Sequence, residues 1–204
     1  MKDHLQLRAA GRMQAKRRKH IRFSSLASRH CEMTQKRTIV DSSSAILLAK
    51  IGLFHRLTEI YEVVMAEAVY GEIARKGYPG ACGFAAARRA GQIRVLSPEG
   101  SFLPTAEDAL TGAGERETIR LYARGEGDFV IIDDRKGAGF CRSAGIPYIN
   151  ALLFPRILRL VGELSESEYR RRTGQLLQNG RYSANIVEVA AGASRERLGR
   201  FLPS

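Results

Sequence analysis

Two short apolar segments of the chain end in carboxylates, and these are the side chains best suited to chemistry. Residues 38–40 are followed by Asp41 and three serines, and residues 129–132 are followed by Asp133 and Asp134. Short runs rich in β-branched residues are typical of buried strands. In open parallel sheets, ligands bind outside the carboxyl ends of the strands. Because gathered like charges raise each other's pKa, a divalent cation is the simplest reason for such acids to meet. Asp41 is equally suited to cap the helix that follows it.

The helix predicted over 66–76 adds a third carboxylate. Val69 and Ile73 mark its apolar face, and Glu72 lies on the border of that face. Glu67 falls on the opposite side and is expected to be solvated. The alternative for Glu72 is a salt bridge at the rim of the core.

A fourth carboxylate opens the helix predicted over 115–124. Glu115 lies on the same face of the predicted helix as Ile119. Glu117 is turned about 200° away from Glu115 and is expected to face solvent or a neighbour. Acids in a first turn also complement the helix dipole, which is the alternative for both residues. The preceding Gly-Ala-Gly run follows no predicted strand and lacks Gly-Lys-Ser/Thr, so it does not predict a phosphate loop.

Oxygen ligands without a neighbouring His or Cys favour Mg²⁺ or Mn²⁺ over Zn²⁺. Three of the four histidines lie within residues 1–36, and His55 stands alone on a predicted helix, so a Ser/His/Asp or Cys/His mechanism has no base. The candidate metal-binding and catalytic acids are Asp41, Glu72, Glu115 and Asp134, with Asp133 and Glu117 in reserve.

The net charge of +12 is concentrated near the N-terminus. Residues 1–36 carry ten Lys or Arg and two acids, and the remaining 168 residues carry 23 and 19. We expect residues 1–36 to be a disordered or weakly helical basic arm that holds nucleic acid through phosphates, unless translation starts at Met33. One domain is predicted over 37–195, followed by a tail over 196–204.

The apolar runs are shorter than the ~18 residues of a membrane-spanning helix, so we expect a soluble protein without a membrane partner. The three cysteines are widely separated and form no CxxC pair, which favours the reducing cytoplasm.

Strand and helix patterns alternate along the domain, which predicts an α/β fold with a mainly parallel sheet covered on both faces. Strands are predicted from Thr38 and over 62–65, 93–96, 129–133 and 148–149. Helices are predicted over 44–50, 53–61, 66–76, 81–90, 115–124, 136–144, 151–161 and 165–178. Residues 97–112 read as a loop, and 186–191 fit either helix or strand.

Between residues 38 and 190 the chain resembles the PIN-domain nucleases, in particular the toxin-like branch of prokaryotic type II toxin–antitoxin modules. The resemblance is carried by the order and spacing of four pieces: Ile39-Val40-Asp41-Ser42-Ser43, Ala68-Val69-Tyr70-Gly71-Glu72-Ile73, Gly114-Glu115-Arg116-Glu117 and Val130-Ile131-Ile132-Asp133-Asp134-Arg135-Lys136.

This resemblance implies a three-layer α/β/α sandwich that gathers three or four acids at one edge, holds Mg²⁺ or Mn²⁺ and cleaves RNA. By position, the matching acids are Asp41, Glu72, Glu115 and Asp134, with Asp133 adjacent, and Ser43 assists the metal or its water. It further implies a homodimer and a small antitoxin protein that blocks the acidic edge. Rim cations expected to hold the RNA backbone are Lys50, Arg135, Lys136 and Arg142.

Two features depart from the family pattern. The basic arm is not part of it, and Asn150-Ala151 replaces the usual Gly-Thr after the last strand, although Asn150 can still cap the next helix.

Two other functions compete with the nuclease. A phosphotransferase of the haloacid-dehalogenase type needs a second Asp two residues after the first, and position 43 is Ser. A non-catalytic nucleic-acid or protein binding module on a degenerate PIN scaffold would keep the basic surface but bind metal poorly.

Overall fold

We describe a computed structural model of the protein over residues 35–75, 77–78, 80–98 and 112–203. The chain divides into two units, Met1–Glu32 and Met33–Ser204. The predicted basic arm lies outside the described residues except for Gln35 and Lys36, as does the predicted loop except for its two ends.

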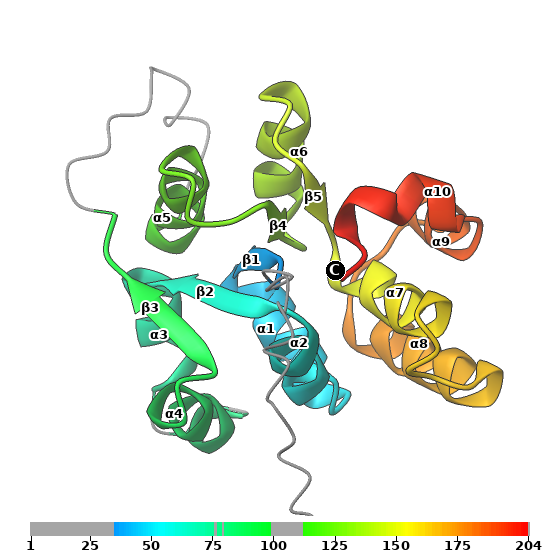
Figure 1. Cartoon of the computed structure of the whole chain (residues 1–204), viewed down its shortest axis with the longest axis horizontal. Helices are drawn as coiled ribbons and strands as arrows, with labels where there is room; N and C mark the ends of the chain where they lie inside the picture. The colour runs from blue at the N-terminus through cyan, green and yellow to red at the C-terminus, as the bar shows by residue number, and fades with distance from the viewer. Residues whose placement is uncertain (1–34, 76, 79, 99–111, 204) are drawn as a thin grey trace, which may run out of the picture. The chain divides into compact units, whose positions relative to one another are not determined.

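The described domain is built on a five-stranded sheet in which every pairing is parallel (Figure 1). Its order is β3-β2-β1-β4-β5. The strands are β1 (Arg37–Val40), β2 (Glu62–Ala66), β3 (Ile93–Leu96), β4 (Phe129–Ile131) and β5 (Tyr148–Ile149). The three central strands are almost entirely buried, as expected for a parallel sheet covered on both faces. The prediction of a parallel sheet is thus confirmed, although β4 ends at Ile131 and not at 133.

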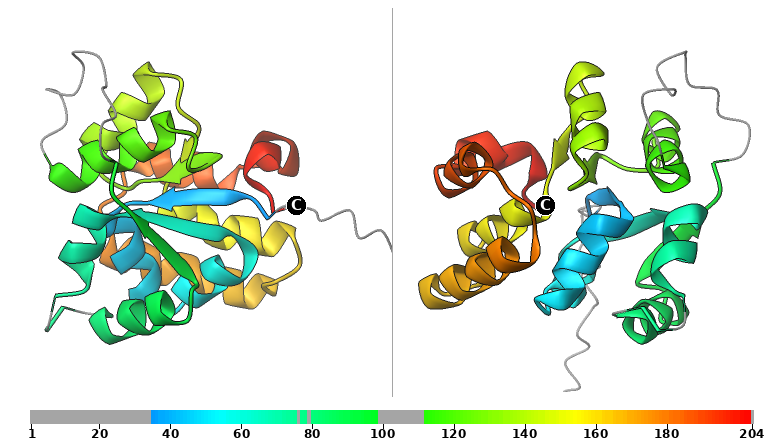
Figure 2. Two further views of the ribbon diagram at one scale, coloured as in Figure 1. Left: turned by 60° about the vertical axis from the view of Figure 1, so that its left-hand side comes forward. Right: turned by 180° about the vertical axis from the view of Figure 1, so that it is seen from behind.

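Helices cover both faces of this sheet, which confirms the three-layer α/β/α fold (Figure 2). α5 and α6 lie on one face, and α1, α2, α4, α7 and α8 lie on the other. Their bounds are α1 (Ser42–Lys50), α2 (Phe54–Ile60), α3 (Glu67–Ile73), α4 (Ala81–Arg89), α5 (Ala113–Ala123), α6 (Arg135–Ser143), α7 (Phe154–Leu160), α8 (Glu166–Asn179), α9 (Ala184–Ala191) and α10 (Arg195–Leu198). The ambiguous residues 186–191 are therefore helical, and the helix predicted over 66–76 ends at Ile73.

Side-chain caps fix where several of these helices begin. Asp41 caps α1, Asp134 caps α6 and Ser165 caps α8. Asn150, as predicted, caps the next element: its side chain accepts a hydrogen bond from Leu153 N in the short 3₁₀ helix Ala151–Leu153. Each cap satisfies an N–H group that has no partner within its own helix.

The segment 196–204, predicted as a tail, packs its described residues onto the domain. Leu198, Phe201 and Leu202 are buried in the hydrophobic core, and the Phe201 ring meets Phe129 edge to face. Tyr61 donates a hydrogen bond to the carbonyl of Phe201. None of the described helices has the length and apolar character needed to cross a bilayer.

Candidate active site

The strand order reverses direction between β1 and β4, and a carboxylate follows each of these two strands. From β1 the chain moves outward through β2 to β3, whereas β4 pairs on the other side of β1 and leads to β5. Asp41 comes directly after β1, and Asp133 comes two residues after β4. Asp41 N donates to Ile131 O at 3.1 Å, which holds the two strand ends together. Such a reversal is where open α/β sheets form their ligand crevice.

Asp41 is both a helix cap and a buried charge. Its Oδ1 accepts a hydrogen bond from Ser44 N at 2.8 Å, and its Oδ2 accepts one from Ser43 Oγ at 2.6 Å. The side chain is buried, and burial, together with the charge of Asp133, raises the pKa of Asp41 to about 7. An N-cap whose only role is structural sits at the favourable end of the helix dipole and keeps its charge easily. A buried acid with a raised pKa beside a second acid is a candidate functional group.

Ser44 joins Asp41 to Asp133. The Ser44 backbone N–H binds Asp41, and its Oγ donates to Asp133 Oδ2 at 2.8 Å. Asp133 Oδ2 also accepts from Ala151 N at 2.9 Å, and Asp133 Oδ1 accepts from the Tyr182 hydroxyl at 2.6 Å. Burial raises the pKa of Asp133, although these hydrogen bonds act to lower it. Burial and the neighbouring Asp133 also raise the pKa of Tyr182, so its hydroxyl remains a donor.

Asp134 has a different role from Asp133. Its Oδ2 accepts from Lys136 N at 2.6 Å and from Gly137 N at 2.8 Å, so the carboxylate caps α6. A Cβ at Gly137 would overlap the end of the Ile132 side chain, so a larger residue there would force Ile132 to shift. Sequence reasoning placed Asp134 first and Asp133 in reserve, but the structure places Asp133 beside Asp41.

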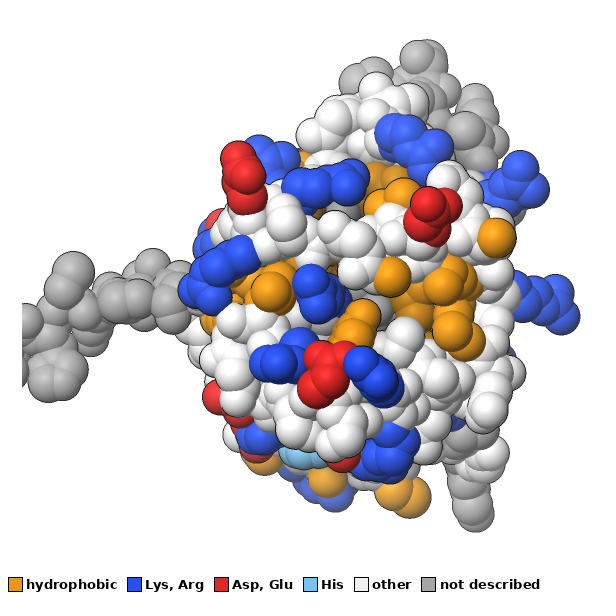
Figure 3. All heavy atoms as spheres, turned by 90° about the vertical axis from the view of Figure 1, so that its right-hand side faces the viewer, with side chains coloured by type: hydrophobic (Ala, Val, Ile, Leu, Met, Phe, Trp, Pro, Cys, Tyr) orange, Lys and Arg blue, Asp and Glu red, His pale blue; other side chains and the backbone are white. Residues whose placement is uncertain are grey.

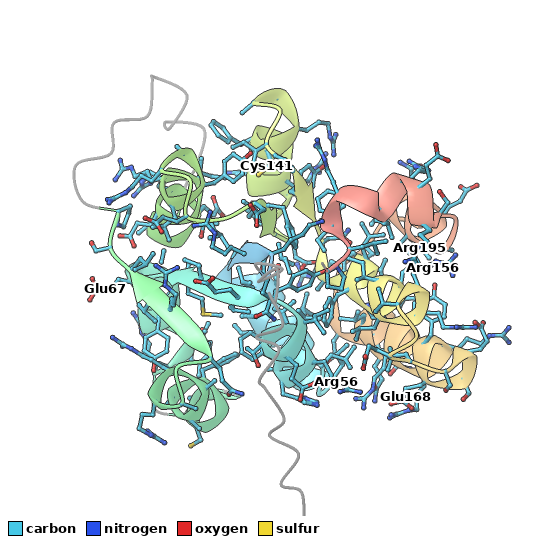
Figure 4. The ribbon with its side chains drawn as sticks, in the orientation of Figure 1. Arg56, Glu67, Cys141, Arg156, Glu168 and Arg195 are labelled. Atoms are coloured by element: carbon cyan, nitrogen blue, oxygen red, sulfur yellow. The ribbon has the colours of Figure 1, made fainter. Side chains whose placement is uncertain are left out.

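The glutamates lie where α3 packs against α5. A Cβ on Gly114, in the first turn of α5, would lie 3.5 Å from Glu72 Oε1, so Glu72 faces the turn of α5 that also carries Glu115. Oε2 of Glu115 is buried. Glu117 Oε2 accepts from Ala68 N at 2.9 Å, so this reserve residue stabilises the N-terminus of α3. Glu67 is exposed and points away from the molecule, as predicted (Figure 4).

The four predicted acids thus do not form a single ready-made cation site. Within the described residues, no group of three or more His, Cys, Asp or Glu side chains is arranged to hold a metal ion. The pair formed by the buried Asp41 and the partly buried Asp133 nevertheless fits Mg²⁺, which is commonly bound through one or two carboxylates while waters and substrate phosphates supply the other ligands. Among the described residues, no His or Cys side chain completes a metal-binding group with this pair, and His and Cys are the ligands that Zn²⁺ usually takes.

Comparison with protein families identifies the domain. A family model described as DUF3368, PIN domain, matches residues 37–163. The chain belongs to the PIN-domain family. No curated protein and no solved structure matches the chain. PIN domains are generally nucleases that use divalent metals, so the acid pair at the strand reversal lies on a nuclease fold.

A pocket of about 360 Å³ opens beside the acids of the PIN domain. Its lining residues are Ser43, Ile46, Leu47, Asp133, Asp134, Asn179, Gly180, Arg181 and Tyr182. The last four follow the end of the family match and were missed by sequence reasoning. No local pattern relates them to the acids, since only tertiary packing brings residue 182 to residue 133. A second pocket, of about 380 Å³, is mainly apolar and is lined by none of the candidate acids.

The predicted RNA-binding cations differ in their distance from the acid pair. Arg135 and Lys136 open α6 directly after Asp134 and are exposed. Lys50 ends α1, ~12 Å along the helix axis from its first residue, so it lies away from Asp41. Arg142 lies in the last turn of α6 and donates to the Tyr148 hydroxyl at 3.2 Å.

Proposed function

We propose that the protein is a Mg²⁺- or Mn²⁺-dependent ribonuclease of the cytoplasm. The observation that carries this proposal is a carboxylate pair at the strand reversal of a PIN domain: Asp41 is buried, and the partly buried Asp133 is joined to it through Ser44. Two neighbouring acids whose pKa values are raised by loss of solvation are costly to hold side by side, and a bound dication removes that cost.

The chain's own residues set the geometry of this site. Ser44 is fully buried and hydrogen-bonded to both acids, so it fixes the spacing between Asp41 and Asp133. Ser43 orients the second oxygen of Asp41. Glu72 and Glu115, at the contact of α3 with α5, are the acids best suited to complete the ligand set. When bound, the ion would polarise the phosphoryl oxygen of the RNA and lower the pKa of a water molecule.

The direct test is cleavage of a labelled RNA by the full chain. We expect cleavage with Mg²⁺ or Mn²⁺, loss of cleavage with excess EDTA, and recovery when Mn²⁺ is restored. Cleavage that continues in EDTA would contradict metal dependence. Binding of RNA without cleavage at any metal concentration would favour the competing function, a binding module on a degenerate PIN scaffold.

We propose further that the ribonuclease is the toxin of a toxin–antitoxin pair and forms a homodimer. This part of the proposal is supported by the sequence resemblance to the toxin-like branch of the family. An antitoxin would act by covering the acidic edge of the sheet. Co-expression with the product of an adjacent small gene should yield a stable complex that no longer cleaves RNA.

The distribution of charge along the domain supports a proposal for where RNA would bind. Residues 37–163 hold 16 Lys or Arg and 15 acids, whereas residues 164–203 hold seven and four. Most of the domain's positive excess therefore lies after the family match. Figure 3 shows the side of the molecule that carries α7 to α10, with Lys and Arg side chains spread among apolar patches. Such a surface attracts phosphates.

Arg181 is the arginine of this segment that lines the acid pocket. It is exposed, and among the described residues it forms no ion pair, so its charge is available to a phosphate. We expect Arg181→Ala to weaken RNA binding roughly 3–10-fold and to reduce the salt dependence of binding by about one phosphate contact. The control is Arg89→Ala, an exposed arginine at the end of α4, which packs near β3 at the opposite edge of the sheet. Equal effects of the two variants on RNA binding, measured by fluorescence anisotropy, would count against this role.

A further inference from the structure

A tyrosine outside the family match contacts the acid pair. The match ends at residue 163, and Tyr182 lies between α8 and α9. Its hydroxyl donates to Asp133 Oδ1 at 2.6 Å, a short and strong hydrogen bond to a carboxylate. The segment after the matched residues therefore reaches the centre of the candidate site.

The Tyr182 ring packs against Gly180 and occupies space that a side chain at position 180 would need. A Cβ at Gly180 would lie 3.0 Å from Tyr182 Cζ and closer still to Cε2, so the ring rests directly on the glycine backbone. The same Cβ would lie 3.1 Å from the carbonyl oxygen of Leu176. A side chain at position 180 therefore cannot coexist with the observed ring position.

Counting hydrogen bonds shows what the hydroxyl does to Asp133. Each carboxylate oxygen has about two lone-pair sites. Oδ2 of Asp133 accepts from both Ser44 Oγ and Ala151 N and is filled. Oδ1 accepts from Tyr182 and keeps one site. Counting only donors within the described residues, Asp133 is therefore left with one free site, on the oxygen that also accepts from Tyr182.

We propose that Tyr182 is a positioning residue that aims the remaining lone pair of Asp133 Oδ1 at a divalent cation held with Asp41. The inference rests on the proposed metal-dependent function. Hydrogen-bonding partners of metal ligands orient those ligands, and removing one typically weakens metal binding or activity about 10–100-fold.

The test is calorimetric titration of Mn²⁺ into the full chain and its variants, with no RNA present. We expect Tyr182→Phe, which keeps the ring and removes the hydroxyl, to bind Mn²⁺ about 10–100-fold more weakly than the wild type. Gly180→Ala keeps the hydroxyl but displaces the ring, so it should lose affinity as well. Tyr169→Phe is the matched control: Tyr169 lies on α8, where its ring packs near Arg156, and it should bind Mn²⁺ like the wild type. Circular dichroism checks that each variant is folded.

A second readout separates positioning from a general structural effect. If Tyr182 aims a ligand, the Mn²⁺ concentration for half-maximal RNA cleavage should rise in Tyr182→Phe, and cleavage at saturating Mn²⁺ should largely recover. Mn²⁺ affinity equal to or higher than that of the wild type would overturn the positioning role while leaving the metal-dependent function intact. No Mn²⁺ binding by the wild type itself would overturn both.

Discussion

Asp41→Asn is expected to abolish RNA cleavage while making the metal-free protein more stable. Cleavage should fall on the order of 10²–10³-fold or more, because the variant loses a charged ligand that stabilises developing charge through the ion. The helix cap survives, since Asn Oδ1 can accept from Ser44 N as Asp41 does. Activity and stability should therefore change in opposite directions.

The gain in stability follows from the sign of the pKa shift. An Asp side chain ordinarily has a pKa of 3.8, whereas the pKa of Asp41 in the folded protein is about 7. The folded protein favours the protonated form of Asp41. Protonated Asp41 therefore makes its full contribution to the free energy of unfolding below about pH 4, and this contribution is lost as the pH rises through about 7. Asn imitates the protonated acid at every pH. The free energy of unfolding of Asp41→Asn should thus exceed that of the wild type by on the order of 2–4 kcal/mol at pH 8, and by little at pH 4.

Denaturant unfolding at pH 4 and pH 8, in EDTA, measures this difference. Glu67→Gln is the control, because Glu67 is an exposed acid on α3 and its neutralisation should alter neither cleavage nor the pH dependence. A variant Asp41→Asn that is less stable than the wild type at pH 8 would show that the charge of Asp41 is already compensated without a cation.

Asp133→Asn is expected to reduce cleavage far more than Asp134→Asn. Asp133 is hydrogen-bonded through Ser44 to the same backbone turn as Asp41, whereas Asp134 accepts from two N–H groups of α6. In Asp133→Asn the amide oxygen can still accept from Ser44 and Ala151, so the fold should survive while the charge is lost. We expect a loss on the order of 10²-fold or more for Asp133→Asn.

Asp134→Asn should lose less than about tenfold, because Asn caps helices as well as Asp does. Cleavage rates at saturating Mn²⁺, measured side by side, decide between the two aspartates. If Asp134→Asn proves the more damaging change, Asp134 and not Asp133 is the ligand from this strand end.

The adjacent pair shows where sequence reasoning reached its limit. The apolar run 129–132 predicted a strand with acids at its tip, and the sheet confirms this. Which acid faces the site depends on where the strand ends and the helix begins. Because β4 ends at Ile131 and α6 begins at Arg135, position 134 becomes the helix cap and position 133 turns toward β1. Sequence periodicity leaves such boundaries uncertain by several residues.

Other residues also show that features set by local sequence could be predicted, whereas features set by tertiary contacts could not. Glu67 was predicted to be solvated from helical phase alone and is exposed. Lys50 was placed at the rim of the site by the resemblance, yet the length of α1 carries it to the far end of the helix. Tyr182 had no local signal at all, since its role depends on a contact across 49 residues of sequence.

The most direct measurement is a crystal structure of the wild-type chain grown with Mn²⁺, with anomalous scattering recorded to locate the ion. We predict an anomalous peak in contact with carboxylate oxygens of both Asp41 and Asp133, with Tyr182 still hydrogen-bonded to Asp133. A peak that contacts neither aspartate, or no peak at a Mn²⁺ concentration that supports cleavage, would contradict the account.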